Sequence, residues 1–205
     1  MSKYRSSFSS IYIDGTDIPK NKLDINNSID IHEAENMLLE QAYIKLSSER
    51  NRKTILNETY YISLHKKTFE ALYTSAGIYR NVNMSKGESQ FCLAQYLDVE
   101  LKRIFTDLKE DNYLQDIAMD KKAFAKKLAY YQGELIALHP FYELNGRITR
   151  LYCDILALSC GYNAIDYSDA IDNGAYIDAS IACCVLYADT GLLEKIIFDG
   201  LVHGY

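Results

Sequence analysis

Proline is scarce in this chain. Its 205 residues include only two prolines, Pro19 and Pro140, beside ten scattered glycines. Because proline and glycine interrupt helices more than other residues do, their scarcity predicts long helices joined by short connections. Hydrophobic residues make up 48% of the chain and charged residues 24%, a balance typical of a soluble globular domain. The length suffices for one domain with a sizeable core, or for a domain with a small appendage.

The charge balance excludes several classes of function. The formal net charge is −6 and the pI is about 5.2, whereas a nucleic-acid-binding protein usually has a basic face. We therefore expect no nucleic-acid partner, and any anionic ligand should be small and held in a locally basic pocket. No apolar run is long enough to cross a membrane, and residues 1–8 lack the apolar core of a signal peptide, so we expect a cytoplasmic location. Five cysteines fit neither a disulfide framework nor a zinc site.

Apolar periodicity predicts an all-α fold with one inserted β-hairpin. Residues 1–27 are expected to be irregular. Asp30 and Glu33 form a capping-box pattern at the start of the first predicted helix. The hairpin strands are predicted over Arg80–Met84 and Ser89–Leu93, around a turn at residues 85–88. Helices are predicted over residues 30–47, 58–73, 94–109, 121–138, 147–160 and in stretches of 168–202.

Two polar residues lie on predicted helix faces that are otherwise apolar. His65 shares a face with apolar side chains, and we interpret it as a core or boundary histidine whose ring nitrogens are satisfied. Glu35 lies four residues after Ile31 and four before Leu39. A carboxylate there is costly unless a partner neutralises it, so Glu35 either reaches solvent at the rim or has a partner elsewhere.

Residues 139–150 contain most of the candidate chemistry. The residue before a proline avoids the α region, so His139 should be extended and should end the preceding helix. His139 and Glu143 therefore should not share a helix face, which makes a zinc-protease pair improbable. Asn145 and Gly146 form a turn at the start of the next helix, where free backbone N–H groups bind anions.

Two arginines follow that turn. Arg147 and Arg150 are three residues apart in the first turn of a helix, where they repel each other and the helix dipole unless an anion is bound. Glu143 is suited to a Mg²⁺ ion that bridges phosphates. His139 is suited to act as the general base toward an attacking hydroxyl. Together these residues indicate a site for a nucleoside triphosphate.

At these positions the chain resembles the Fic family, whose motif is His-Pro-Phe-x-(Asp/Glu)-Gly-Asn-(Gly/Lys)-Arg-x-x-Arg. The resemblance extends to residues 64–66, 77–83, 85–87 and Phe91, and covers roughly residues 55–165. It implies a Fic/Fido helical bundle with a hairpin called the flap, over residues 79–93. The motif matches at His139, Pro140, Phe141, Glu143, Asn145, Gly146, Arg147 and Arg150.

The resemblance implies a protein adenylyltransferase, which transfers AMP from ATP to a tyrosine, threonine or serine hydroxyl of a protein. His139 would deprotonate that hydroxyl, and Glu143 would bind Mg²⁺. Phe141 would anchor the loop in the core. The flap around Lys86 would align the protein substrate by β-strand addition. Self-modification and a homodimer are compatible with the resemblance.

The nucleotide-binding set implied by the resemblance comprises Lys86, Asn145, Gly146, Arg147 and Arg150. Backbone amides around Asn145 and Gly146 would hold phosphates, and the two arginines would bind the outer ones. Glycine rather than lysine at position 146 favours nucleotidyl transfer over the phosphate transfer of the related Doc proteins.

Many Fic proteins carry an inhibitory helix with the motif (Ser/Thr)-x-x-x-Glu-(Gly/Asn). Glu35 and Asn36 match it, with Ile31 in the place of serine or threonine. We therefore expect Glu35 to pair with Arg150 and to inhibit the site. The resemblance therefore implies three parts of the chain: an N-terminal extension (1–54) with the inhibitory helix at 30–47, a Fic core (55–165), and C-terminal helices of the same domain (166–205).

Leu144 stands where the family has glycine. If that position needs a positive φ, leucine costs on the order of 1–2 kcal/mol. Its side chain would also come near the phosphates. One alternative therefore stays open, a weakly active or inactive nucleotide-binding module. A transferase that uses another nucleotide donor stays open as well, because the sequence does not fix the pocket for the base.

Overall fold

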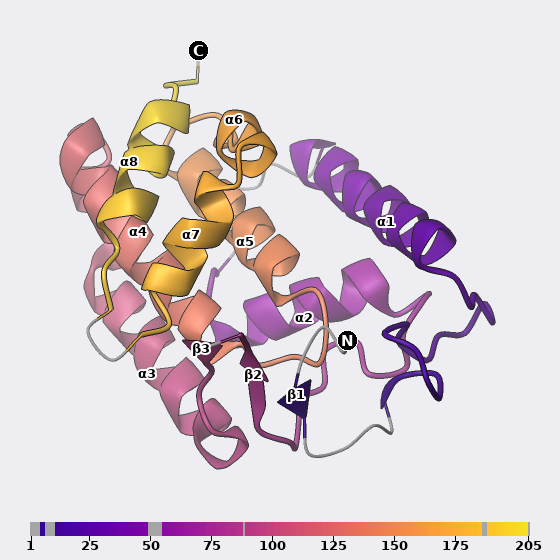
Figure 1. Ribbon diagram of the computed structural model, residues 1–205. Coiled ribbons are helices and arrows are strands. Elements are labelled where there is room, and N and C mark those ends of the chain that lie inside the picture. Colours follow the sequence, from indigo (N-terminus) through magenta and orange to yellow (C-terminus); the bar gives the residue numbers. More distant parts are fainter. Residues whose placement is uncertain (1–4, 7–10, 49–54, 88, 186–187, 205) are drawn as a thin grey trace.

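Helices form most of the protein, with three short strands at one end (Figure 1). The computed structural model describes residues 5–6, 11–48, 55–87, 89–185 and 188–204. The helices are α1 (Ser28–Ser48), α2 (Glu58–Phe69), α3 (Leu97–Glu110), α4 (Lys121–Leu138), α5 (Asn145–Ser159), α6 (Ser168–Asp172), α7 (Ala175–Ala182) and α8 (Gly191–Gly200). Short 3-10 helices lie at Ala94–Tyr96 and Asn112–Ile117. The predicted fold, helical with an inserted hairpin, is confirmed.

Helix α4 is the central element and has the predicted bounds. Asp120 begins it by accepting hydrogen bonds from the backbone N–H groups of Lys122 and Ala123, at 3.1 and 3.0 Å. The helix is buried on several sides because it packs against α3, α5 and α8. Gly133 allows the approach of the C-terminal segment, since a Cβ there would lie 3.0 Å from Thr190. The loop that contains the sequence motif therefore starts from a rigid helix.

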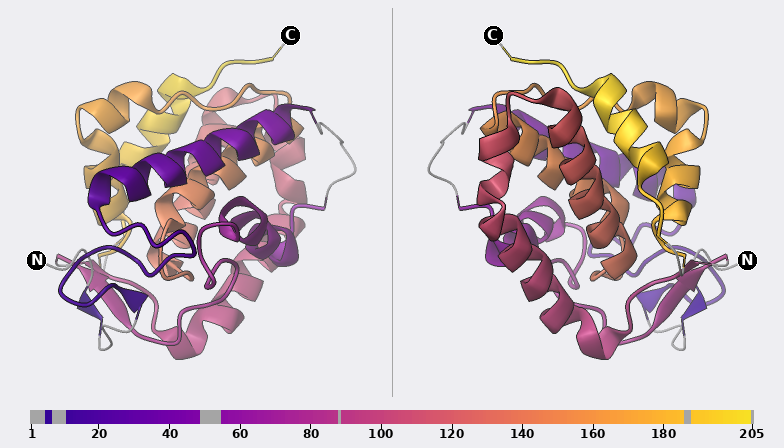
Figure 2. Two further views of the ribbon diagram at one scale, coloured as in Figure 1. Left: turned by 90° about the vertical axis from the view of Figure 1, so that its right-hand side faces the viewer. Right: turned by 90° about the vertical axis from the view of Figure 1, so that its left-hand side faces the viewer.

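Helix α1 is longer than predicted, by two residues at its start and one at its end, and α2 is shorter. Helix α1 begins at Ser28 because Asn27, not Asp30, is its cap: Asn27 Oδ1 accepts the backbone N–H of Asp30 at 2.9 Å. Helix α2 ends at Phe69 rather than Tyr73, since the N–H groups of Leu72 and Tyr73 both turn back to the Phe69 carbonyl. Helix α1 lies across α2 and α5 (Figure 2, left).

The predicted C-terminal helical stretch is divided into α6, α7 and α8. The break between α6 and α7 falls at Gly174, which has a φ of +83°, a backbone conformation that favours glycine. Inside the core, Gln132 of α4 joins this part of the fold through its amide. It donates to the Tyr176 hydroxyl at 3.0 Å and accepts from the Tyr167 hydroxyl at 2.9 Å.

The hairpin strands are shorter than predicted, and a third strand joins them. Strand β2 spans Met84–Lys86 and strand β3 spans Ser89–Gln90, while Glu88 of the predicted turn lies outside the described residues. Strand β1 (Arg5–Ser6) pairs antiparallel with β2, in the region predicted to be irregular. The flanking residues leave the ladder because they bond elsewhere: the N–H of Cys92, for example, donates to the Ala137 carbonyl of α4.

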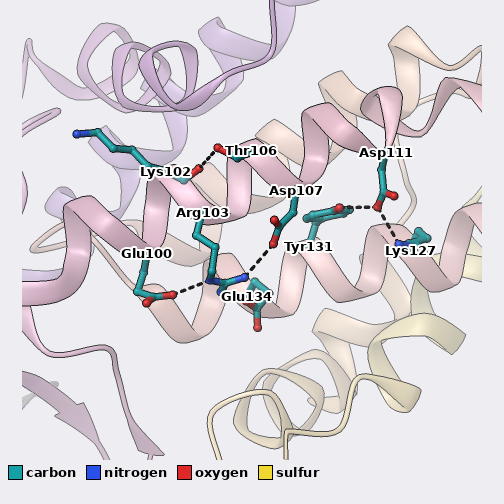
Figure 3. A network of polar contacts seen from close by, with 9 residues as sticks. All are labelled: Glu100, Lys102, Arg103, Thr106, Asp107, Asp111, Lys127, Tyr131 and Glu134. Atoms are coloured by element: carbon teal, nitrogen blue, oxygen red, sulfur yellow. Dashed lines mark hydrogen bonds and ion pairs between the residues drawn. The ribbon is translucent and has the colours of Figure 1, made fainter.

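A network of charged side chains covers the outer faces of α3 and α4 (Figure 3). Arg103 contacts Glu100 and Asp107 on its own helix, and Glu134 on α4. Lys127 of α4 pairs at 2.8 Å with Asp111, the residue that follows α3. These groups are exposed, so each pair contributes about 0.2–1 kcal/mol at most. Of these ion pairs, the one between Arg103 and Glu134 joins α3 to α4.

None of the helices described is both long and apolar enough to cross a membrane.

Candidate active site

His139 ends helix α4 in a left-handed backbone conformation, with φ 49° and ψ 58°. The prediction of an extended residue was therefore wrong, although the helix does stop there. Proline at the next position disfavours the right-handed α region but not the left-handed one, which lets the His139 N–H close the helix on the Leu135 carbonyl at 3.2 Å. The His139 ring is 8% exposed and stacks on Phe91 of the flap, with ring centroids 3.7 Å apart.

Arg80 holds the backbone at His139 and was not recognised from the sequence as a site residue. The side chain is 1% exposed, and its Nε donates to the His139 carbonyl at 2.7 Å. Other donors of the guanidinium reach the carbonyls of Val82, Cys92 and Leu138. Burial lowers the pKa of Arg80 to about 10, so the group is still charged at neutral pH. A buried charge is tolerable here because four carbonyl dipoles surround it.

Phe141 anchors the motif loop in the core, as expected. Its ring is fully buried and stacks on His65, with ring centroids 3.9 Å apart, and on Tyr61 at 5.7 Å. His65 in turn binds the loop backbone: its Nδ1 accepts the Gly77 N–H at 2.9 Å, so Nε2 carries the proton and donates to the Glu143 carbonyl at 3.1 Å. Burial lowers the pKa of His65 to about 4. His65 is thus a neutral core histidine, as interpreted from the sequence.

The loop itself is closed by Asn145. Its side chain accepts the Phe141 N–H and donates to the Phe141 carbonyl, both at 2.8 Å. The side chain of Asn145 therefore shapes the loop from inside and leaves only backbone groups for a ligand. Gly146 follows, and a Cβ at that position would meet nothing within 4 Å. The space at the N-terminus of α5 is open, as a bound anion requires.

Leu144 has a φ of 66°, so the condition under which leucine is strained holds. Its side chain is 6% exposed and belongs to the main hydrophobic core. Whether it comes near the phosphates stays a prediction. The strain is therefore offset by apolar burial, and the backbone of the loop keeps the left-handed turn that glycine would also adopt.

Glu143 is buried, with 6% exposure, and belongs to the same loop. Its Oε1 accepts a hydrogen bond of 2.9 Å from the hydroxyl of Tyr12, a residue 131 positions earlier in the chain. Tyr12 was not among the predicted site residues, and nothing in the local sequence pattern points to it. The contact brings the N-terminal segment into the site.

Glu35 pairs with Arg147, not with Arg150 as predicted. Glu35 Oε2 lies 2.9 Å from Arg147 Nη1, and Glu35 Oε1 accepts a hydrogen bond of 2.6 Å from the hydroxyl of Tyr73. Arg150 instead lies over the ring of Tyr176, 4.8 Å from its centroid. The Glu35 side chain is 3% exposed, so this partner is what makes burial of the carboxylate tolerable.

The described residues also limit how a metal ion could be held. They contain no group of three or more histidine, cysteine or acidic side chains that could bind a metal by itself. Glu143 offers one buried carboxylate in the loop. That fits Mg²⁺, which commonly uses one or two carboxylates together with phosphate oxygens. Lys86, the remaining predicted binding residue, is exposed at the end of β2.

The fold and this loop define a class of protein: a helical domain with an open turn at the start of a core helix, beside a β-hairpin. Within that class the chain belongs to the Fic/DOC family, whose profile matches residues 55–157.

Two relatives and two solved structures illustrate the likeness. "Probable protein adenylyltransferase y4lH" of Sinorhizobium fredii is 28% identical over 181 residues, which cover 88% of this chain and 91% of that protein. "Protein adenylyltransferase VbhT" of Bartonella schoenbuchensis is 30% identical, over 99% of this chain and 41% of that protein. The fold is similar to that of the BepC protein of Bartonella tribocorum with bound AMPPNP, with a TM-score of 0.80 at 20% identity, covering 96% of this chain and 98% of that one. It is also similar to a Fic domain of Bartonella quintana with bound ADP, with a TM-score of 0.81 at 20% identity, covering 95% of each chain.

Proposed function

We propose that this protein is a Mg²⁺-dependent protein adenylyltransferase that transfers AMP from ATP to a tyrosine, threonine or serine hydroxyl of a protein. The observation that carries the proposal is the motif loop, which joins His139, the buried Glu143 and the open N-terminus of α5 around a single turn. The names of the relatives support the same activity.

In this proposal each group of the loop has one task. The His139 imidazole accepts the proton of the attacking hydroxyl. The backbone N–H groups at Asn145 and Gly146 bind phosphate oxygens at the positive end of the α5 dipole. Glu143, together with phosphate oxygens, holds Mg²⁺, which when bound neutralises phosphate charge. Arg147 and Arg150 bind the outer phosphates.

Regulation by helix α1 is part of the proposal. Glu35 neutralises Arg147 through their 2.9 Å ion pair, so a phosphate has to displace the carboxylate to reach this guanidinium. The hydrogen bond from the Tyr73 hydroxyl to Glu35 Oε1 also holds the carboxylate in this position. Ile31, where the inhibitory motif would have a hydroxyl, is instead buried in the core at 3% exposure. We infer that Glu35 lowers activity by competing with ATP for Arg147 rather than for Arg150.

The flap is proposed to align the protein substrate by strand addition. Lys86, exposed at the end of β2, is proposed to contribute to nucleotide binding. Self-modification belongs to the same proposal, because the chain contains 18 tyrosines that could accept AMP.

The test uses labelled ATP and Mg²⁺ with three proteins: the unchanged chain, Glu35→Gly and His139→Ala. We expect Glu35→Gly to incorporate more label than the unchanged chain, and His139→Ala to incorporate none above background. Undiminished labelling of His139→Ala would contradict the mechanism. Parallel reactions with the four nucleoside triphosphates identify the donor. Binding of ATP without label transfer, in all three proteins, would favour the nucleotide-binding module instead.

A further inference from the structure

The flap edge that would receive a protein substrate is occupied by the chain's own N-terminal strand. Strand β2 has β3 on one side and β1 on the other, with Arg5 opposite Ser85 and Ser6 opposite Met84 (Figure 1). An extended peptide that docks by strand addition bonds to a free edge of a sheet. Because β1 already makes such bonds to β2, the N-terminal segment is in the position of a docked substrate.

Six residues after β1, Tyr12 enters the site. Its side chain is 4% exposed, and its hydroxyl donates to Glu143 Oε1 at 2.9 Å. The ring packs in a small apolar cluster with Val82, Met84 and Phe91 of the flap region. Phe91 stacks directly on the His139 ring, at 3.7 Å between centroids. The phenol of Tyr12 is therefore held between the flap and the loop that contains both His139 and Glu143.

A tight turn fixes Tyr12 in this place. The Ile13 N–H donates to the Ile18 carbonyl and the Lys20 N–H donates to the Ile11 carbonyl, both at 2.9 Å, with Tyr12 bridged to Pro19 between them. Ile18 is buried in the main core, which ties the turn to the helical bundle. Tyr12 is thus presented by an ordered turn, and its hydroxyl loses little conformational freedom when it reacts.

Tyr142, inside the motif loop, packs against the same apolar cluster, but its hydroxyl bonds to Asn81 at 2.8 Å. Three other tyrosines near the motif are held on its helical side. Tyr61 bonds to Thr149, Tyr73 bonds to Glu35, and the Tyr176 ring lies under Arg150. Each of these contacts involves α5 or α1, not the flap. Tyr12 differs from all four because its hydroxyl bonds to Glu143 of the motif loop while its ring packs with the flap residues.

We propose that Tyr12 is the residue that the protein modifies on itself, with strand β1 on the flap holding this part of its own chain as a tethered substrate. This inference rests on the adenylyltransferase function proposed above. The phenolic oxygen attacks the α-phosphorus of ATP, and a new O–P bond forms while the bond from that phosphorus to the oxygen bridging to the β-phosphorus breaks. The phenolic proton passes to the His139 imidazole, and the leaving group is pyrophosphate. The product is Tyr12 with AMP on its phenolic oxygen.

The experiment incubates the full chain with ATP and Mg²⁺ and locates the added AMP by peptide mapping. Glu35→Gly is treated in parallel so that inhibition does not conceal the reaction. We expect one AMP per chain, on the peptide that contains Tyr12. Tyr12→Phe should lose this modification, whereas Tyr96→Phe, a matched change at a half-exposed tyrosine after the flap, should keep it. The rate constant should not change on about tenfold dilution, since donor site and acceptor belong to one chain.

Each contrary result has a distinct meaning. AMP on a different residue, or undiminished incorporation by Tyr12→Phe, overturns the assignment of Tyr12 and leaves the proposed function in place. If the rate constant of self-modification falls in proportion to dilution, the reaction occurs between two chains, and the tethered substrate is overturned. If neither labelled protein nor pyrophosphate forms with the unchanged chain or with Glu35→Gly, the assignment of Tyr12 is overturned; the proposed function fails as well if added proteins also stay unlabelled. Mapping of the unchanged chain gives the site directly, so the conclusion does not depend on whether Tyr12→Phe folds normally.

Discussion

Arg147 Nη1 lies 2.9 Å from Glu35 Oε2, and this ion pair joins α5 to α1 across 112 positions of the chain. The Glu35 side chain is 3% exposed and that of Arg147 is 24% exposed, so the carboxylate depends on its partner far more than the guanidinium does. This asymmetry distinguishes Arg147 from Arg150.

We expect Arg147→Ala to destabilise the fold much more than Arg150→Ala. The first change leaves a buried carboxylate without its ion-pair partner, at a cost of about 3–5 kcal/mol. The second removes a cation–π contact with Tyr176, worth about 0.5–2 kcal/mol. Urea unfolding of both variants measures the difference. Combining Arg147→Ala with Glu35→Gln should recover part of the loss, and equal losses for the two arginines would contradict the observed pairing.

At position 144 we expect the glycine variant to be more stable than the alanine variant, the reverse of the usual order in helices. Both Leu144→Ala and Leu144→Gly lose the buried side chain, but only glycine relieves the φ of 66°. Glycine should therefore be more stable than alanine here by about 1 kcal/mol, whereas inside a helix it is less stable by about that amount. Thermal or urea unfolding of the pair gives the comparison. An alanine variant as stable as the glycine variant would show that the backbone has relaxed.

Arg80→Lys should lower both stability and turnover. An ammonium group keeps the charge but cannot reach carbonyls on several segments at once, so buried acceptors are left unsatisfied at about 1–3 kcal/mol each. Because the His139 backbone loses its support, we expect kcat to fall more than KM rises. Arg103→Lys, in the exposed network on α3, is the matched control and should change stability by less than about 1 kcal/mol. Loss of stability with normal kcat would limit Arg80 to a structural role.

The burial of His65 predicts a specific pH dependence of the free energy of unfolding. Burial lowers its pKa to about 4 from an ordinary 6.5, so the folded protein binds fewer protons than the unfolded chain between these values. Its contribution to stability is full above pH 6.5 and is lost as the pH falls toward 4, by about 2–3 kcal/mol at pH 4.5.

The measurement compares unfolding of the unchanged chain with that of His65→Gln from pH 7 to pH 4.5. Glutamine can keep both hydrogen bonds of His65 without titrating. Burial raises the pKa of Asp154 to about 6, which acts in the opposite direction, but this group is present in both proteins and cancels in the difference. A difference that stays constant over the range would mean that His65 is not held neutral by the fold.

Local sequence determined the elements whose signals are complete within a few residues. Helix α4 has the predicted bounds because Asp120 caps one end and Pro140 excludes continuation at the other. The loop at residues 139–150 could also be located from the sequence, since it closes on itself through Asn145 and Phe141.

Tertiary structure decided the contacts that join distant parts of the chain. Which arginine meets Glu35 depends on where α1 crosses α5, and residues three apart on a helix differ too little in direction for the sequence to choose. The pairing of β1 with β2 and the Tyr12–Glu143 hydrogen bond likewise have no local pattern, because their partners come together only when the helical core has formed. The sequence thus determined which groups are present in the loop, and the packing of helices and strands decided which of them Glu35 and Tyr12 contact.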